Sequence, residues 1–242
     1  TQATLRSGFF ILMKRKLLLL HGALGSSAYF KPLATILEEH YEILTLDFSG
    51  HGSNVFSQKG FSIEVFAQEV FAFLEEKAIE KIDVFGYSMG GYIALKQEAV
   101  SHGTFSGIFT LATKFDWSPE IAQKEKAMLN PAKMLEKVPD YADMLMHRHF
   151  PGDWKKVCEE TAYLMEHLGK HAMAADDFDN VLCKVRLAVG DRDMMVTMNE
   201  TRRVFTELPD ASMMVMPHTS HPIEKINMTY LSEEICRFAA EL

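Results

Sequence analysis

The stretch "VFGYSMGGYIAL", residues 84–95, places Ser88 between Gly86 and Gly90, directly after an apolar run and directly before a helix-like one. A strand that reverses sharply into a helix needs residues without side chains around the turn, and the central residue is then strained and exposed. Two interpretations of Ser88 are open at this point. It is a nucleophile, or it is a helix N-cap after a glycine turn, a common position for serine.

Short apolar runs and longer amphipathic runs alternate on both sides of this stretch. The predicted strands are residues 16–22, 41–47, 81–86, 105–113, 184–191 and 212–217. The predicted helices are residues 28–40, 62–79, 89–102, 198–209 and 222–242. Nearly continuous apolar strands separated by helices are typical of a parallel sheet that is covered on both faces. The sequence therefore predicts an α/β fold with a mostly parallel central sheet flanked by helices.

The alternation stops between about residues 115 and 180. This region is rich in Met, Lys, Glu and His, has helical stretches without a convincing strand, and is broken at Pro119, Pro131, Pro139 and Pro151. We therefore predict a core of residues 1–116 and 181–242 that carries a helical cap insertion, residues 117–180. We expect this cap to cover the carboxyl edge of the sheet and to enclose a mainly apolar pocket with Ser88 at its floor.

Composition and charge exclude several classes of protein. The chain has 242 residues, of which 48% are hydrophobic, and a net charge of −8. This size suits one domain with a large core, and the acidic balance argues against a nucleic-acid partner, because phosphate binding needs clustered Lys and Arg. Cys158, Cys183 and Cys236 are far apart, which argues against a disulfide framework or a zinc knuckle and favours a reducing, cytoplasmic location.

The amino terminus contains the apolar pieces "FFILM" and "LLLL", which "KRK" separates. Each piece is far shorter than the ~20 residues that a membrane-spanning helix needs. A signal peptide has its positive charges before a continuous apolar core, which is not the order found here. We therefore predict no membrane span, and we predict Met13 as the natural start, with residues 1–12 as an upstream extension. The sequence indicates no cofactor and does not indicate an oligomeric state.

The carboxyl-terminal third supplies the partners that a nucleophilic serine needs. A serine hydroxyl requires a base to take its proton, and the base requires a third group to fix its tautomer. Asp191 and Asp193 follow one predicted strand, and His218 and His221 follow the next. The carboxyl ends of parallel strands meet at one edge of the sheet, so we expect these loops to lie near Ser88. Each residue alone is typical of a turn, but the order Ser, Asp, His favours the nucleophile.

With these motifs in place, the chain resembles the α/β-hydrolase fold family over about residues 17–115 and 181–242. The resemblance rests on "LLLLHG", "DFSGHG", "GYSMGG", "GDRDMMV" and "SHPIE" together. It implies Ser88 as the nucleophile, Asp193 as the acid and His221 as the base.

The same resemblance implies the groups around this set. An oxyanion needs two backbone N–H donors, and the family pattern assigns them to Ala23 and Met89. His21 is then a residue that braces the loop. Asp191 and Asp116 stay open as alternative acids, the latter because some relatives carry the acid after the equivalent strand.

Several further residues are candidates for the pocket or for a metal site. The predicted pocket residues are Lys114, Phe115, Trp117 and Met194. Two histidine pairs are candidates for a metal site, namely His147 with His149 and His167 with His171, and the second pair is spaced to share one helix face as metal ligands would. Neither pair has an acidic or cysteine partner at ligand spacing, so we predict solvated helix surface for all four and no metal.

The resemblance implies a serine hydrolase that cleaves a small or medium ester, thioester or related acyl compound through an acyl-enzyme, without a cofactor. Two alternatives to this function remain open. In the first, the same three residues carry out other chemistry, which is carbon–carbon bond hydrolysis in some relatives and a lyase reaction of menaquinone synthesis in another. In the second, the protein is a non-catalytic binding protein with this fold. A small-molecule partner with an acidic group is also open, because Lys114 and Arg148 lie in or near the expected pocket.

Overall fold

The computed structural model describes residues 14–242, so Met13 and residues 1–12, on which the predicted start depends, lie outside the described residues. Six strands form one sheet in the order β2-β1-β3-β4-β5-β6, and every neighbouring pair is parallel. The strands are β1 Arg15–Leu20, β2 Tyr41–Leu46, β3 Ile82–Tyr87, β4 Phe105–Leu111, β5 Lys184–Gly190 and β6 Ala211–Met216. The predicted parallel sheet is therefore confirmed.

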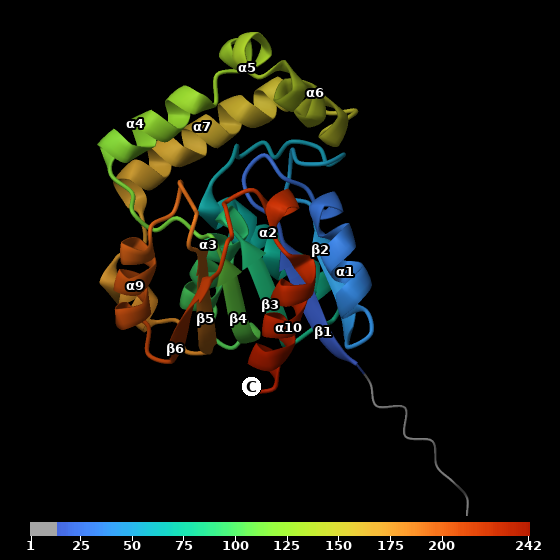
Figure 1. The fold of residues 1–242 in the computed structure, drawn as a ribbon, viewed down its shortest axis with the longest axis vertical. Coiled ribbons are helices and arrows are strands. Elements are labelled where there is room, and N and C mark those ends of the chain that lie inside the picture. The colour runs from blue at the N-terminus through green and yellow to red at the C-terminus, as the bar shows by residue number, and fades with distance from the viewer. Residues whose placement is uncertain (1–13) are drawn as a thin grey trace, which may run out of the picture.

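Helices cover both faces of the sheet (Figure 1). They are α1 Lys31–Leu37, α2 Ile63–Glu76, α3 Met89–Val100, α8 Ala175–Asp179, α9 Met198–Glu207 and α10 Met228–Ala239, with short 3-10 helices at Ser27–Phe30 and Ile223–Lys225. Successive side chains of a strand point to opposite faces, so β1 supplies both layers. Leu17 and Leu19 pack with α1 and α10, whereas Leu18 and Leu20 pack with α2 and α3.

A separate layer of helices lies across one end of the sheet (Figure 1). It contains α4 Pro119–Met128, α5 Pro131–Lys137, α6 Pro139–Arg148 and α7 Trp154–His171. Three of these helices have proline in their first turn, where a missing N–H costs no hydrogen bond. Of the four prolines that interrupt the helical pattern in the sequence, Pro119, Pro131 and Pro139 therefore mark the starts of helices, whereas Pro151 lies in the turn before α7.

The two ends of this layer lie against each other. Helices α4 and α7 pack together, and Gly169 near the end of α7 faces Ser118, the N-cap of α4. A Cβ atom on Gly169 would lie 2.7 Å from the Cβ atom of Ala122 and 3.0 Å from the carbonyl oxygen of Ser118. Glycine is therefore needed at this close approach of α7 to the start of α4. Because these two ends are in contact, the segment α4–α7 begins and ends at nearly the same point.

Two details differ from the predicted elements. Helix α8, which the predicted division assigns to the cap, contacts α3 and α9 in the layer on the sheet. The predicted single helix over 222–242 is wrong, because α10 begins only at Met228, where the side chain of Asn227 accepts a hydrogen bond from the N–H of Tyr230. The division of the chain into core and cap at residues 117 and 180 stays a prediction. Among residues 14–242, no helix is long and apolar enough to cross a membrane.

Candidate active site

Ser88 occupies the sharp turn between β3 and α3. Its backbone has φ 52° and ψ −116°, a strained conformation for a residue with a side chain. The glycines around it allow direct contact between backbones, because a Cβ atom on Gly86 would lie 2.4 Å from Gly91 Cα and one on Gly90 would lie 2.1 Å from the carbonyl oxygen of Leu20. Ser88 is the N-cap residue of α3, but within residues 14–242 its side chain makes no capping hydrogen bond. A role as a helix N-cap therefore does not explain why the side chain at this position carries a hydroxyl.

His221 faces Ser88 and Asp193 with its two ring nitrogens. Ser88 Oγ lies 3.4 Å from His221 Nε2, and His221 Nδ1 lies 2.8 Å from Asp193 Oδ2. A carboxylate accepts but does not donate, so Nδ1 carries the hydrogen and Nε2 is the acceptor that points to the serine. The longer serine contact is typical of sites without substrate. The hydroxyl of Tyr87 donates to the carbonyl oxygen of His221 at 2.7 Å and holds this loop on the end of β3.

Asp193 is a buried carboxylate that is held in its charged form. Burial raises its pKa, but the hydrogen bond and charge of His221 and the N–H groups of Val196 and Met195 lower it, and the net pKa lies below the usual value. Asp193 Oδ1 accepts from Met195 at 2.8 Å and from Val196 at 2.9 Å, which leaves Oδ2 for the imidazole. The charge and orientation of Asp193 suit it to fix the tautomer of His221.

The other candidate acids bind elsewhere. Asp191 is exposed, and its Oδ1 accepts from the N–H of Thr219 at 3.0 Å, so it braces the loop that carries the histidines. Asp116 Oδ1 lies 3.0 Å from Arg203 Nη2 on α9. Of the acidic side chains in the described part of the chain, Asp193 is the one within 4.0 Å of the His221 ring nitrogens.

His218, the other histidine of this loop, points away from the serine. It is exposed, its φ is 53°, and its Nδ1 lies 2.5 Å from Arg192 Nη2. Of the two histidines that the sequence offers as a base, the structure thus brings His221 to Ser88.

The two residues expected to stabilise an oxyanion line the same cavity as the serine. Met89 is the first residue of α3, so its N–H has no acceptor within the helix. The N–H of Ala23 belongs to the peptide whose carbonyl oxygen is that of Gly22. This oxygen accepts from the N–H of Gly25 at 3.0 Å and lies 2.8 Å from Nδ1 of His21. The peptide that presents the Ala23 donor is therefore fixed from its carbonyl side.

Another carbonyl of this loop, that of Leu24, is held by residues at the end of helix α6. Leu24, which has φ 56°, accepts from Arg148 Nη1 at 2.8 Å, and its carbonyl oxygen lies 3.2 Å from His149 Nε2. The N–H of Gly52 donates to His149 Nδ1 at 3.1 Å, so the ring hydrogen is on Nε2 and points to Leu24. Burial and the charge of Arg148 lower the pKa of His149 to about 4, which keeps it neutral. The prediction that His149 lies on a solvated surface is wrong, because its ring is enclosed by the core loops.

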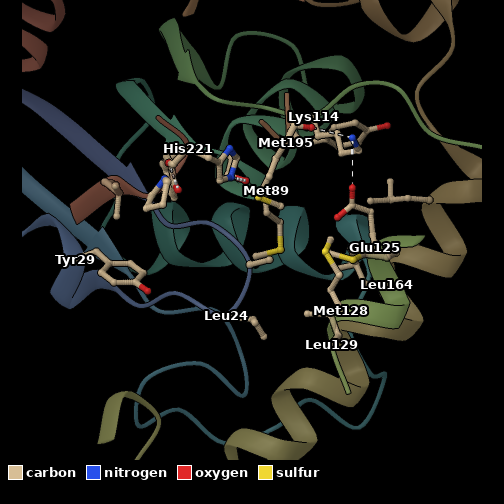
Figure 2. A pocket seen from close by; sticks show the side chains of 18 of the residues that line it. Leu24, Tyr29, Met89, Lys114, Glu125, Met128, Leu129, Leu164, Met195 and His221 are labelled. Atoms are coloured by element: carbon tan, nitrogen blue, oxygen red, sulfur yellow. Dashed lines mark hydrogen bonds and ion pairs between the residues drawn. The ribbon is translucent and has the colours of Figure 1, made fainter. Parts of the chain in front are cut away.

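A cavity of about 370 Å³ lies between the sheet edge and α4–α7, with Ser88 and His221 in its wall (Figure 2). Most of its lining is apolar, with leucine and methionine side chains from both layers. Lys114 and Trp117 line it as predicted, but two other predicted pocket residues lie elsewhere. Phe115 is buried against Tyr92 and Phe178, and Met194 is 94% exposed.

Comparisons with known proteins agree with this fold. The sequence profile of the Alpha/beta hydrolase family matches residues 17–233. The chain belongs to this family. The predicted resemblance, the predicted fold class and the prediction of an α/β-hydrolase enzyme are therefore confirmed.

Similar proteins of the family include hydrolases and esterases. "Putative carbamate hydrolase RutD" from Shigella flexneri is 24% identical over an alignment of 223 positions, which covers 84% of this chain and 83% of that protein. The enol-lactonase from Burkholderia xenovorans has a similar structure, with a TM-score of 0.75 and 17% identity, and 94% and 92% of the two chains are covered. An esterase from Exiguobacterium antarcticum has a TM-score of 0.78 at 13% identity, with 93% of this chain and 92% of that chain covered.

Each cation beside the pocket of this α/β-hydrolase already has an acidic partner. Lys114 Nζ lies 3.5 Å from Glu125 Oε1 in α4, and it donates to the carbonyl oxygen of Met195 at 3.0 Å. Arg148 Nη2 lies 3.6 Å from Glu224 Oε1, and the guanidinium lies 3.9 Å from the centre of the Tyr29 ring. In the described residues, each of these two cations therefore has a carboxylate within 4.0 Å.

Sequence reasoning missed much of the pocket lining, including Met195 and Glu125. Met195, and not its neighbour Met194, lines the cavity, because the direction of a side chain in a loop follows from the loop conformation. Glu125 also lines it. The available signal for Glu125 was its helical spacing from Ala122 and Leu129, which are both buried. A glutamate on the apolar side of a helix indicates a partner or a cavity.

Proposed function

We propose that this protein is a serine hydrolase that cleaves an ester, thioester or related acyl compound through an acyl-enzyme on Ser88. The observation that carries the proposal is the continuous set of contacts from Ser88 Oγ to His221 Nε2 and from His221 Nδ1 to Asp193 Oδ2. This arrangement leaves an unprotonated ring nitrogen beside a strained hydroxyl at the wall of an apolar cavity. Nucleophilic catalysis by serine requires such a base within reach of the hydroxyl and a third group that orients the base.

In the first half of the proposed reaction, Ser88 Oγ attacks the carbonyl carbon, and its proton moves to His221 Nε2. The charge of the imidazolium is balanced by Asp193. The carbonyl oxygen becomes an oxyanion, which accepts hydrogen bonds from the N–H groups of Ala23 and Met89. When the tetrahedral intermediate collapses, the bond to the leaving group breaks, and the leaving group takes the proton from His221.

The second half repeats the same steps with water. His221 Nε2 takes a proton from a water molecule, the hydroxyl attacks the acyl carbon, and a second oxyanion forms in the same position. Collapse of this intermediate breaks the bond between the acyl carbon and Ser88 Oγ. Ser88 recovers its proton from His221, and the carboxylic acid leaves.

The cavity supports an uncharged acyl group of small or medium size. Its volume of about 370 Å³ is at the lower end of the usual range for small-molecule sites, and its walls are mostly apolar. A carbamate, a lactone and an ester, the compounds named for similar proteins, all contain a carbonyl carbon bonded to oxygen. In this proposal α4–α7 act as the cap that sets substrate range. The cytoplasmic location stays a prediction.

Labelling and turnover test the proposal together. We expect a fluorophosphonate probe to label the wild-type protein and p-nitrophenyl esters to be hydrolysed, with a maximum at short or medium acyl length. Ser88→Ala should abolish both signals. Labelling that persists in Ser88→Ala would refute the assigned nucleophile. Labelling of Ser88 without turnover of any ester would contradict ester hydrolysis and favour carbon–carbon cleavage or the lyase reaction.

A further inference from the structure

Glu125 is a carboxylate inside an otherwise apolar part of the cavity (Figure 2). It lies on α4, it is 9% exposed, and Met128, Leu129 and Leu164 surround it in the lining. Within residues 14–242, no group donates a hydrogen bond to its carboxylate, and the cation within 4.0 Å is Lys114, at 3.5 Å. Buried carboxylates normally accept several hydrogen bonds. The carboxylate of Glu125 therefore has unused acceptor capacity that faces the cavity.

Lys114 offers the complementary group at the same place. Its ammonium has three N–H donors. One binds the carbonyl oxygen of Met195 at 3.0 Å and another faces Glu125, which leaves one donor. Lys114 and Glu125 together present an acceptor and a donor to the cavity with no net charge. We call these two residues the polar pair.

The polar pair lies away from the position of the leaving group. In Figure 2, His221 and Tyr29 lie on one side of Met89, and the polar pair lies on the other. His221 must reach the leaving group to protonate it, so the leaving group occupies the side of His221. The acyl group then extends along the methionine and leucine side chains toward the polar pair.

From this geometry we propose that Lys114 and Glu125 form a subsite for an uncharged hydrogen-bonding group, a hydroxyl or a primary amide, at the distal end of the acyl group. The inference rests on the proposed acyl-transfer function. An apolar acyl chain of the same length would exclude water from the polar pair and leave the remaining donor of Lys114 and the remaining acceptors of Glu125 without partners. Sites built to hydrogen-bond a substrate group reject analogues that lack it by large factors. A substrate carboxylate would compete with Glu125 for Lys114, and a substrate ammonium would compete with Lys114 for Glu125.

Matched ester series test this subsite directly. The p-nitrophenyl esters of alkanoic acids would be compared with esters of equal chain length that carry a terminal hydroxyl or carboxamide. We expect wild-type kcat/KM to favour the polar series by about tenfold or more at the best chain length. The double variant Lys114→Met/Glu125→Met removes the polar pair without leaving one charge unpaired, and it should prefer the alkanoate series.

An ion pair outside the cavity gives the control. Lys126 Nζ in α4 and Glu166 Oε2 in α7 lie 2.7 Å apart, and neither residue lines the cavity. Lys126→Met/Glu166→Met should keep the wild-type preference. Equal hydrolysis of both series by the wild-type protein would overturn the subsite while the hydrolase proposal stands, and this comparison needs no variant. A control pair that shifts the preference as much as the polar pair would also overturn it. No Ser88-dependent turnover of either series would overturn both proposals.

Discussion

Gly90 is the residue on which the position of Ser88 depends most directly. A methyl group there would meet the carbonyl oxygen of Leu20 at 2.1 Å, and backbone atoms of a central strand cannot move aside cheaply. We expect Gly90→Ala to lower the free energy of unfolding by about 3 kcal/mol or more. Gly103→Ala is the control, because no described atom lies within 4 Å of its added carbon and only its φ of 82° is unfavourable, at about 1 kcal/mol. Urea unfolding would measure the free energy of unfolding of both variants. Equal decreases in the two variants would contradict the role of Gly90 in this close contact.

Asp193 and Asp191 differ in what their carboxylates hold. Asp193 fixes the imidazole of His221, whereas Asp191 holds the backbone N–H of Thr219. We expect Asp193→Asn to lower kcat for an ester by about 10³- to 10⁴-fold, because an amide N–H in place of a carboxylate oxygen favours the wrong tautomer. Asp191→Asn should lower kcat by less than about tenfold, because it disturbs the loop but does not change the tautomer of His221. Similar losses in the two variants would require another acid, with Asp116 the first to test.

The end of helix α6 contacts the loop that carries Ala23. His149→Leu removes the hydrogen bond to the Leu24 carbonyl oxygen and leaves the N–H of Gly52 without its acceptor. We expect kcat to fall about tenfold with a smaller change in KM, because a misplaced oxyanion donor acts on the transition state. His149→Gln, which keeps a donor and an acceptor, should recover part of the loss.

His147 provides the matched control for this helix end. It lies two residues away on α6, and its side chain is 74% exposed. His147→Leu should leave kcat and KM near wild-type values. A variant of His149 that raises KM and keeps kcat would show that the contact serves substrate binding and not the oxyanion loop.

The elements of the core could be predicted because each of them follows from local pattern. Strands such as "KLLLLHG" are apolar on both faces, which is typical of a parallel sheet that is covered on both faces. The glycines on both sides of Ser88 predict the sharp turn there. The convergence of the loops at Ser88, Asp193 and His221 follows from parallel topology. Their catalytic roles stay predictions.

What could not be predicted depends on contacts between distant segments. The burial of His149 requires Gly52 and Leu24, which are about a hundred residues away in the chain. Likewise, Met194 and Met195 are indistinguishable in the sequence, and only the bend of the loop after β5 decides which one faces the cavity. Helical patterns also do not show which layer a short helix such as α8 joins.

For the molecule as a whole, three buried histidines make stability depend on pH. Burial lowers the pKa of His21 to about 4, and burial with the charge of Arg148 lowers that of His149 to about 4; the pKa of His51 is also well below normal. In the unfolded chain each has a pKa of about 6.5, so below that pH the unfolded state binds more protons than the folded state. Stability is therefore complete above about pH 6.5 and falls as the pH drops from there toward about 4.

Thermal unfolding at a series of pH values between neutral and about 4.5 would measure this loss. We expect a decrease of several degrees in Tm across the window, and a smaller decrease in His149→Gln, which has one proton fewer to take up on unfolding. His147→Gln should follow the wild-type curve because that ring is exposed. A Tm that does not change over this window would contradict neutral buried histidines in the folded state.

The contact of Gly169 with Ser118 has a consequence for how the segment between β4 and β5 can be exchanged among α/β-hydrolases. Strands β4 and β5 are neighbours in the sheet, and the excursion between them begins and ends at one junction. A segment whose ends already meet can be exchanged for one of different length at little entropic cost to the core, since loop closure depends only weakly on length. Transplanting the stretch between Ser118 and Gly169 from another hydrolase, with its junction kept, should therefore transfer substrate range while Ser88, Asp193 and His221 stay where β3, β5 and β6 hold them.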